Sequence, residues 1–335
     1  MFAAAVPKAV ALAREVDELV VICDSAAEGQ ELPANVRVRT FGATSRTRRA
    51  ARFGAALAAE LRPRPVIAVA HMVPLYVVAA TPLLRAAGVP VVLWYTHWAD
   101  HGVLRISERT ASAITSVDTR SFPFSSPKVH GTGHGIDIAQ FPPIGATKRE
   151  GVFTLLVAGR YADHKGLPQV LRATRVLLDR DFAVRTVLRG PTMTPGEERV
   201  KRELQALAVE LELGDAVEIG PVAPRDELPE IFARVDVLVC NHVSPDKIVY
   251  EAAASALPVL VSHPAFDELL GDIEPSLLFA HDDPESLADA VVAVAGTSPE
   301  RRRAIGELLR ERVAERHSVD HWAAQMLVHA RRTAG

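Results

Sequence analysis

Residues 154–166 read TLLVAGRYADHKG, and this stretch decides the fold. Thr154–Val157 is a short apolar run of the kind found in the buried strands of parallel sheets. Gly159 allows the chain to turn sharply off the end of that strand, and a helical pattern follows Gly166. A strand, a tight turn and a helix in this order are the building unit of α/β proteins with parallel sheets.

The same alternation runs through the rest of the chain. We predict strands over residues 19–22, 36–38, 66–69, 89–94, 153–157, 183–188, 217–219, 235–239 and 259–261. We predict helices over residues 6–16, 45–61, 74–87, 167–178, 197–211, 226–233 and 248–256. A Pro-, Gly- and Ser-rich segment over residues 123–151 separates the two series. The pattern therefore predicts an α/β protein with two doubly wound parallel sheets, which would place a ligand cleft between the carboxyl ends of their strands.

Length and charge agree with two domains. The chain has 335 residues, 48% of them hydrophobic, and a net charge of −3. Residues 1–145 carry a net charge of +4 and the remainder carries −7. This near-neutral balance gives no sign of a nucleic-acid partner. Two cysteines cannot form a disulfide framework, and no secretion leader is evident, so we expect a cytoplasmic protein.

We predict an N-terminal domain over residues 1–145, a C-terminal domain over residues 146–310, and a last helix over residues 311–335 that crosses back to the first domain. The first predicted helix, residues 6–16, has no strand before it. Because a doubly wound half normally starts with a central strand, we expect that the first strand of the N-terminal domain is missing.

The loop after the strand at 154–157 carries two cations. Arg160 offers a planar fork of donors and Lys165 a point charge, and both lie just before a helix N-terminus. This combination suits a diphosphate. The alternative is a solvated loop, since no P-loop signature occurs in the sequence.

A second polar stretch, residues 241–251, lies between a strand and a short helix. Amide groups around Asp246, Lys247 and Ile248 would point out from the start of that helix. Glu251 stands among small apolar residues and needs a donor, which sugar hydroxyls could supply. The alternatives are an internal salt bridge and a solvated helix face.

Taken together, the two stretches resemble the retaining glycosyltransferases of the GT-B fold, family 4. Flanking segments agree over residues 152–295: LRGP at 188–191, LELGDAV at 211–217, IGPV at 219–222 and ELPEIFA at 227–233. A looser likeness over residues 60–145 includes WYTH at 94–97 and GHGID at 133–137.

The resemblance implies a metal-independent hexosyl- or glycosyltransferase that moves a sugar, with retention, from a nucleotide-diphosphate donor to an acceptor in polysaccharide or glycolipid synthesis. The donor is then a substrate, and no cofactor or metal is implied. The resemblance assigns His97, Arg160 and Lys165 to catalysis. It assigns donor binding to Gly159, Arg160, Lys165, Gly190, Val222, Asp246, Lys247, Ile248 and Glu251. Of these, Glu251 would bind the ribose and residues 220–222 would lie beside the base.

One position departs from the family. Val243 stands where the family often has a first glutamate, eight residues before Glu251. This departure keeps open a non-catalytic nucleotide-sugar-binding or scaffold protein. A nucleotide-sugar epimerase of the same fold is a further alternative, although no acid/base carboxylate pair is evident.

The predicted helix over residues 45–61 carries a cluster of arginines: Arg46, Arg48, Arg49 and Arg52. An ordinary surface helix is one interpretation. The other is peripheral contact with anionic lipid at the inner membrane face, which a lipid-linked acceptor would favour.

Overall fold

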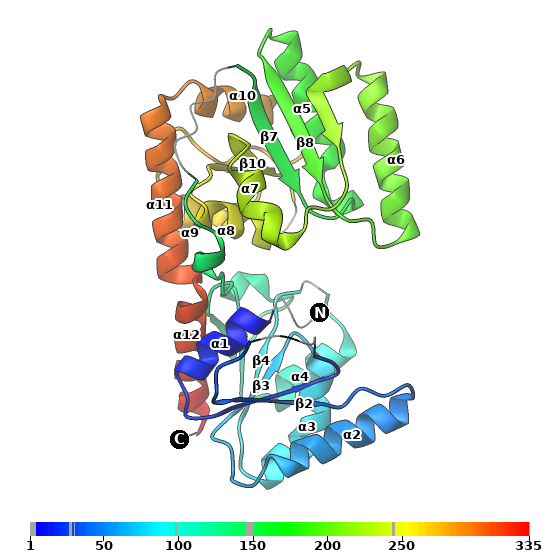
Figure 1. The fold of residues 1–335 in the computed structure, drawn as a ribbon, viewed down its shortest axis with the longest axis vertical. Helices are drawn as coiled ribbons and strands as arrows, with labels where there is room; N and C mark the ends of the chain where they lie inside the picture. Colours follow the sequence, from blue (N-terminus) through cyan, green and yellow to red (C-terminus); the bar gives the residue numbers. More distant parts are fainter. Residues whose placement is uncertain are drawn as a thin grey trace. The chain divides into compact units, whose positions relative to one another are not determined.

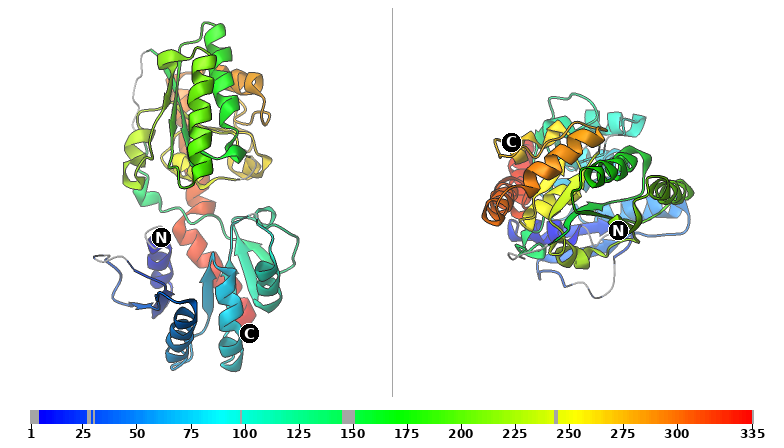
Figure 2. Two further views of the ribbon diagram at one scale, coloured as in Figure 1. Left: turned by 90° about the vertical axis from the view of Figure 1, so that its right-hand side faces the viewer. Right: turned by 90° about the horizontal axis from the view of Figure 1, so that it is seen from above.

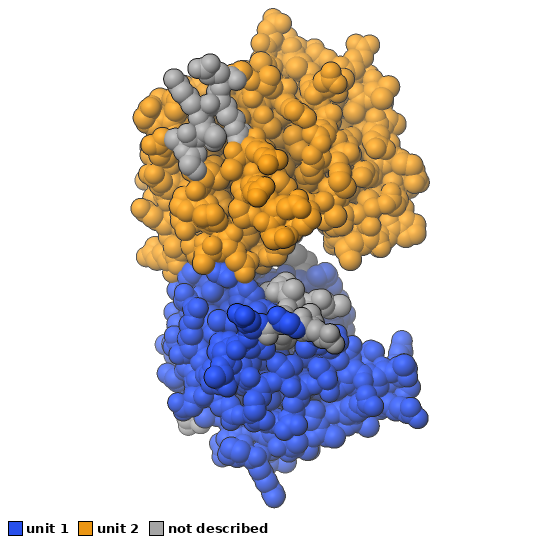
Figure 3. Space-filling view, in the orientation of Figure 1, with its two compact units in different colours: residues 1–137, 316–335 blue, residues 138–315 orange. Residues whose placement is uncertain are grey.

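The computed structural model describes residues 5–26, 29, 31–97, 99–144, 151–242 and 245–334. The chain forms two compact units (Figure 3). Unit 1 comprises residues 1–137 and 316–335, and unit 2 comprises residues 138–315. Each unit is an α/β body with parallel strands, so the predicted fold class of two Rossmann-like domains is confirmed.

Unit 1 contains two separate parallel sheets. The first pairs β1 (Leu19–Cys23) with β2 (Val36–Thr40), and the second has the order β3-β4-β5-β6. The strands of this second sheet are β3 (Ala68–His71), β4 (Val91–Trp94), β5 (Ala113–Ser116) and β6 (Val129–Gly131). The helices are α1 (Val6–Arg14), α2 (Arg46–Ala59), α3 (Pro74–Ala86), α4 (Gly102–Thr110) and α12 (Val319–Ala334).

Strand β4 shows how the core of unit 1 is divided. Val91 and Leu93 pack into a cluster with α3 and α4, whereas Val92 and Trp94 pack with α1 and α12. This alternation follows from the two-residue period of a strand. The ring of Trp322 on α12 meets that of Trp94 edge to face at 5.9 Å. Residues near the C-terminus thereby cover one face of the sheet of unit 1.

The predicted strand at 66–69 is wrong by two residues. The structure places β3 at Ala68–His71 and leaves Val66 69% exposed. A strand extends only as far as its partner does, and β3 starts pairing where Ala68 N donates to Pro90 O. Because proline has no N–H, β4 itself begins at Val91 and not at the predicted residue 89.

Helix α2 presents arginines to solvent, while its apolar residues face inward. The ring of Phe53 stacks on Tyr76 with centroids 5.1 Å apart, and Leu57 is buried in the core of unit 1. Among the arginines, Arg49 pairs with Asp24 at 3.1 Å. Any contact of this helix with a membrane would therefore depend on charge rather than on inserted apolar side chains.

Unit 2 is built around one five-stranded parallel sheet with the order β11-β10-β7-β8-β9 (Figures 1 and 2). Its strands are β7 (Phe153–Ala158), β8 (Val184–Arg189), β9 (Val217–Ile219), β10 (Val237–Cys240) and β11 (Val259–Val261). Its helices are α5 (Leu167–Asp179), α6 (Pro195–Glu210), α7 (Leu228–Phe232), α8 (Lys247–Ala254), α9 (Asp267–Leu270) and α10 (Pro284–Ala295). Helix α11 spans Pro299–His317.

The chain changes direction in this sheet. From β7 it proceeds through β8 to β9, and it then returns across the sheet to β10 on the other side of β7. Helices α5, α6 and α10 pack together in one layer (Figure 2). Since parallel crossovers are right-handed, the reversal puts α8, which joins β10 to β11, on the opposite face.

A buried histidine in unit 1 makes stability depend on pH. Burial lowers the pKa of His317 to about 4, and the nearby charges of His321 and Arg316 act in the same direction against Asp118. In the unfolded chain the pKa of histidine is about 6.5. The unfolded state therefore binds the extra proton between these values, and acid favours unfolding.

Lowering the pH from 7 to 4.5 should reduce the free energy of unfolding through His317 by about 2–3 kcal/mol. Urea unfolding at the two pH values measures this change. In His317→Gln the acid-induced loss should be smaller by that amount. An unchanged pH dependence in the variant would contradict the assignment.

Candidate functional site

The carboxyl ends of β7 and β10 are the point where the strand order of unit 2 reverses. The connections that follow these two strands run in opposite directions, so a crevice forms between them. Open α/β sheets bind ligands in a crevice of this kind. The loop after β7 comprises residues 159–166 and holds Arg160 and Lys165. The loop after β10 comprises residues 241–246 and leads into α8, although residues 243 and 244, and with them Val243, lie outside the described residues.

Two glycines allow the strand ends and loops to approach closely. Gly159 has a φ of +151°, and a Cβ on Gly190 would lie 1.7 Å from the carbonyl oxygen of Gly159. Gly166 has a φ of +58°, and a Cβ there would lie 2.4 Å from Asn241 Nδ2. Any larger residue at position 166 or 190 would collide with these neighbouring atoms.

Lys165 and Asp246 connect the two loops through an ion pair, and both side chains are mostly buried. Asp246 also caps α8, since its carboxylate accepts from Ile248 N at 3.4 Å. Asn241 Nδ2 adds a further link by donating to Gly166 O at 3.1 Å. The ammonium group of Lys165 is thereby fixed over the turn at Gly159.

Arg160 is directed to a different element. Its guanidinium donates to Glu197 Oε1 at 3.0 Å, and Glu197 is a buried residue in the first turn of α6. The other carboxylate oxygen of Glu197 accepts from Met193 N at 2.6 Å. Half of the Arg160 side chain remains exposed, so its charge is positioned yet accessible.

The pKa of His164, in the loop after β7, is affected by both cations of that loop. Desolvation is the first cause of its lowered pKa, and the positive charges of Lys165 and Arg160 are the next. Both cations therefore act on the same imidazole. The carboxylates of Asp163 and Asp246 act in the opposite direction, so this imidazole lies among charges of both signs.

Glu251 lies one turn into α8 with its side chain 4% exposed. Two cations come within ion-pair distance of its Oε1 atom: Arg225 Nη2 at 2.6 Å and Lys247 Nζ at 3.0 Å. The predicted residues Lys165, Asp246, Lys247, Ile248 and Glu251 are thus brought together around the start of α8. Arg160 makes its described ion pair with α6 instead.

The remaining predicted residues are less directly connected to this group. Gly190 N donates to Pro221 O at 3.3 Å, and this hydrogen bond brings the ends of β8 and β9 together. Val222 follows Pro221 in the chain and is 51% exposed. His97 follows β4 in unit 1, where its Nδ1 accepts from Ala99 N at 3.0 Å.

Three residues of this site were missed by the sequence-based site prediction: Glu197, Arg225 and Asn241. Glu197 and Arg225 meet Arg160 and Glu251 only through long-range packing, and nothing in their local sequence marks them. Asn241 directly follows β10, and its position at a strand end was the available signal. No group of three or more His, Cys, Asp or Glu side chains in the described ranges has the arrangement of a metal site.

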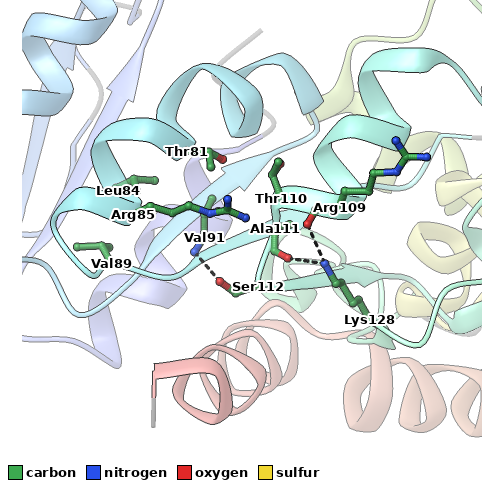
Figure 4. Close-up of a pocket in the computed structure, with 10 residues that line it drawn as sticks. All are labelled: Thr81, Leu84, Arg85, Val89, Val91, Arg109, Thr110, Ala111, Ser112 and Lys128. Atoms are coloured by element: carbon green, nitrogen blue, oxygen red, sulfur yellow. Dashed lines mark hydrogen bonds between the residues drawn. The ribbon is translucent and has the colours of Figure 1, made fainter.

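A hollow of about 310 Å³ in unit 1 contains none of the predicted residues (Figure 4). It opens near the amino ends of β4 and β5, and Arg85, Arg109 and Lys128 line it. Lys128 Nζ donates to the carbonyls of Arg109 and Ala111 at 3.3 and 3.0 Å, so it caps the end of α4. Open α/β sheets bind ligands at the carboxyl ends of their strands, whereas this hollow lies at the amino ends.

Gly190→Ala tests the close approach of β7 and β8. The added methyl must displace the Gly159 carbonyl, so the free energy of unfolding should fall by about 2 kcal/mol in a urea titration. Gly196→Ala is the matched control, because a Cβ there has its nearest neighbour at 3.8 Å and the residue lies in α6. Equal stabilities of the two variants would contradict the described packing.

Comparison with known proteins supplies independent information on this unit. The family model described as glycosyl transferases group 1 matches residues 152–296. The chain is 26% identical over 165 residues to GDP-mannose:cellobiosyl-diphosphopolyprenol alpha-mannosyltransferase of Xanthomonas oryzae pv. oryzae, covering 48% of this chain and 42% of that protein. It is 27% identical over 194 residues to 2-deoxystreptamine glucosyltransferase of Streptomyces kanamyceticus, covering 56% and 47%. The chain therefore spans less than half the length of these relatives.

Solved structures match over nearly the whole chain. Sucrose-phosphate synthase from Thermosynechococcus elongatus superposes with a TM-score of 0.75 at 17% identity, covering 97% of this chain and 91% of that chain. Anabaena HepE in complex with UDP and glucose superposes with a TM-score of 0.74 at 16% identity, covering 98% and 96%. These likenesses confirm the GT-B fold. The family match itself extends over residues 152–296, which lie within unit 2.

Proposed function

We propose that this protein transfers a sugar from a nucleoside-diphosphate donor to an acceptor, and that unit 2 holds the donor. The observation that carries the proposal is the meeting of Lys165, the start of α8 and Glu251 at the reversal point of the sheet. A cation and a helix N-terminus suit the diphosphate, and a buried carboxylate suits the ribose. Two relatives of the chain are named as a mannosyltransferase and a glucosyltransferase.

The chemistry follows from where charge develops. When the bond between the anomeric carbon and the donor phosphate oxygen breaks, the nucleoside diphosphate gains negative charge and the sugar becomes cationic. Arg160 and Lys165 stabilise the departing diphosphate, which lowers the barrier to cleavage without requiring a divalent metal. The acceptor oxygen then bonds to the anomeric carbon on the same face, and its proton passes to a donor phosphate oxygen. The configuration of the sugar is retained.

Other residues take supporting roles in this proposal. Gly159 and Gly190 keep side chains away from the diphosphate, and the amides at Lys247 and Ile248 donate to it. Val222 contacts the base. Contact of His97 with the transferred sugar stays a prediction.

Donor binding and turnover test this assignment. Lys165→Ala and Arg160→Ala should each lower the affinity for nucleoside diphosphates and the rate of transfer by about 10- to 100-fold, since each removes a charge-assisted hydrogen bond. Calorimetry with UDP, GDP and ADP and a turnover assay with the matching nucleotide sugars measure both effects.

Arg172→Ala is the control for charge, because Arg172 is exposed on α5 and its described contact is with Gln169 at 3.4 Å. It should behave as the unmodified protein. Binding without turnover of any donor would instead favour a non-catalytic nucleotide-sugar-binding protein. Absence of binding to all three nucleotides would exclude the proposed donor site.

We also propose that the acceptor is lipid-linked and that unit 1 contacts an anionic membrane surface through the arginines of α2. One relative is named for a diphosphopolyprenol acceptor. Arg46 and Arg48 lie on the exposed side of this helix. In the described residues, no helix is both long and apolar enough to cross a membrane.

Co-sedimentation with vesicles tests this contact. Binding should rise with the fraction of anionic lipid and fall with salt. It should decrease by about 30-fold in Arg46→Gln/Arg48→Gln, since each basic residue near the surface contributes about 1 kcal/mol. Arg172→Gln is the matched control in unit 2. Binding that ignores the lipid charge would contradict the proposal.

A further inference from the structure

The carboxylate of Glu251 has two cationic partners within the protein. Arg225 Nη2 lies 2.6 Å from its Oε1 atom and Lys247 Nζ lies 3.0 Å from the same atom. Lys247 reaches it from one turn earlier on the same helix, so this contact is local. Arg225 comes from a separate segment, the short 3-10 helix Arg225–Glu227 after β9.

Arg225 is supported from its other side by an aromatic ring. Its guanidinium lies over Phe141 at 5.5 Å from the ring centroid, and Phe141 is 1% exposed. Arg310 Nη1 donates to the carbonyl of Phe141 at 2.5 Å, which fixes the backbone there. The Arg225 side chain itself remains 41% exposed, so it can leave the carboxylate without unpacking the core.

The geometry at Glu251 is incomplete. Oε1 is buried, and its contacts with Arg225 and Lys247 are ion pairs by distance that lack the angles of a hydrogen bond. A hydroxyl group can rotate its proton into line with this oxygen, so it can take the place that Arg225 holds while Lys247 stays.

We propose that Arg225 is a positioning residue that competes with the ribose hydroxyls of a nucleoside diphosphate for Glu251. This inference rests on the proposed function, because it requires the nucleotide to bind in unit 2. Without nucleotide, Arg225 stays on Oε1. When the nucleotide enters, its ribose hydroxyls take that place and Arg225 withdraws, while Lys247 keeps its local contact with the carboxylate.

The competition lowers the measured affinity for ribonucleotides. A ligand that must displace an internal partner binds only the fraction of molecules in which the partner is absent. Removing Arg225 should therefore tighten binding of a nucleoside diphosphate that carries ribose hydroxyls. A 2′,3′-dideoxy analogue has no hydroxyl to place on Glu251, so Arg225 can stay paired and its removal should change nothing.

The experiment uses Arg225→Gln in the full chain. Titrations employ whichever of UDP, GDP or ADP binds the unmodified protein most tightly, together with its 2′,3′-dideoxy counterpart. We expect about a three- to tenfold gain in affinity for the ribonucleotide, the scale of a partly exposed ion pair, and less than a twofold change for the analogue. The preference for ribose should therefore increase.

Arg234→Gln is the matched control. It makes the same change in charge at an exposed arginine near α7, where the partner is Glu230 at 3.6 Å, and it should leave both affinities unchanged. An unchanged or weaker ribonucleotide affinity in Arg225→Gln, or an equal gain for both ligands, would overturn the role of Arg225 while leaving the proposed function standing. If none of the three diphosphates binds the unmodified protein, the proposed function itself fails, and this inference fails with it.

Discussion

The closeness of two loops at the reversal point of the sheet in unit 2 is the constraint on which the site depends. The loops follow β7 and β10, which are neighbours in space although the chain passes through β8 and β9 between them. The ion pair of Lys165 and Asp246 and the hydrogen bond from Asn241 to Gly166 hold the loops together. Without these two contacts, Lys165 and the start of α8 would not act on the same ligand.

The charged side chains of the site are compensated by ion pairs within the protein. Lys165, Arg160 and Glu251 each have an oppositely charged partner in the ligand-free structure. An unpaired charge in such a partly buried position would lower the free energy of unfolding. The ion pairs avoid this loss and hold the side chains in place. In the proposed function, ligand binding is therefore an exchange of partners, with phosphate and ribose replacing carboxylates and a guanidinium. Preorganised groups of this kind need little rearrangement during the reaction.

Much of this arrangement could be predicted from the sequence, because it depends on local patterns. The strand at 153–157, its glycine turn and the helix after Gly166 are observed as β7 and α5, which begins at Leu167. Arg225 could not be predicted, since its contact with Glu251 depends on how the β9 loop packs against α8. Strand β6 lies inside the predicted linker and was not predicted, because its three residues, Val129–Gly131, are too few to show a period.

A crystal structure with a bound nucleoside diphosphate tests the central claim most directly. We predict that the diphosphate oxygens lie within hydrogen-bonding distance, about 3 Å, of the side-chain nitrogens of Arg160 and Lys165, with the ribose on Glu251. A nucleotide bound with its phosphates away from both cations, or located on unit 1 alone, would contradict the account.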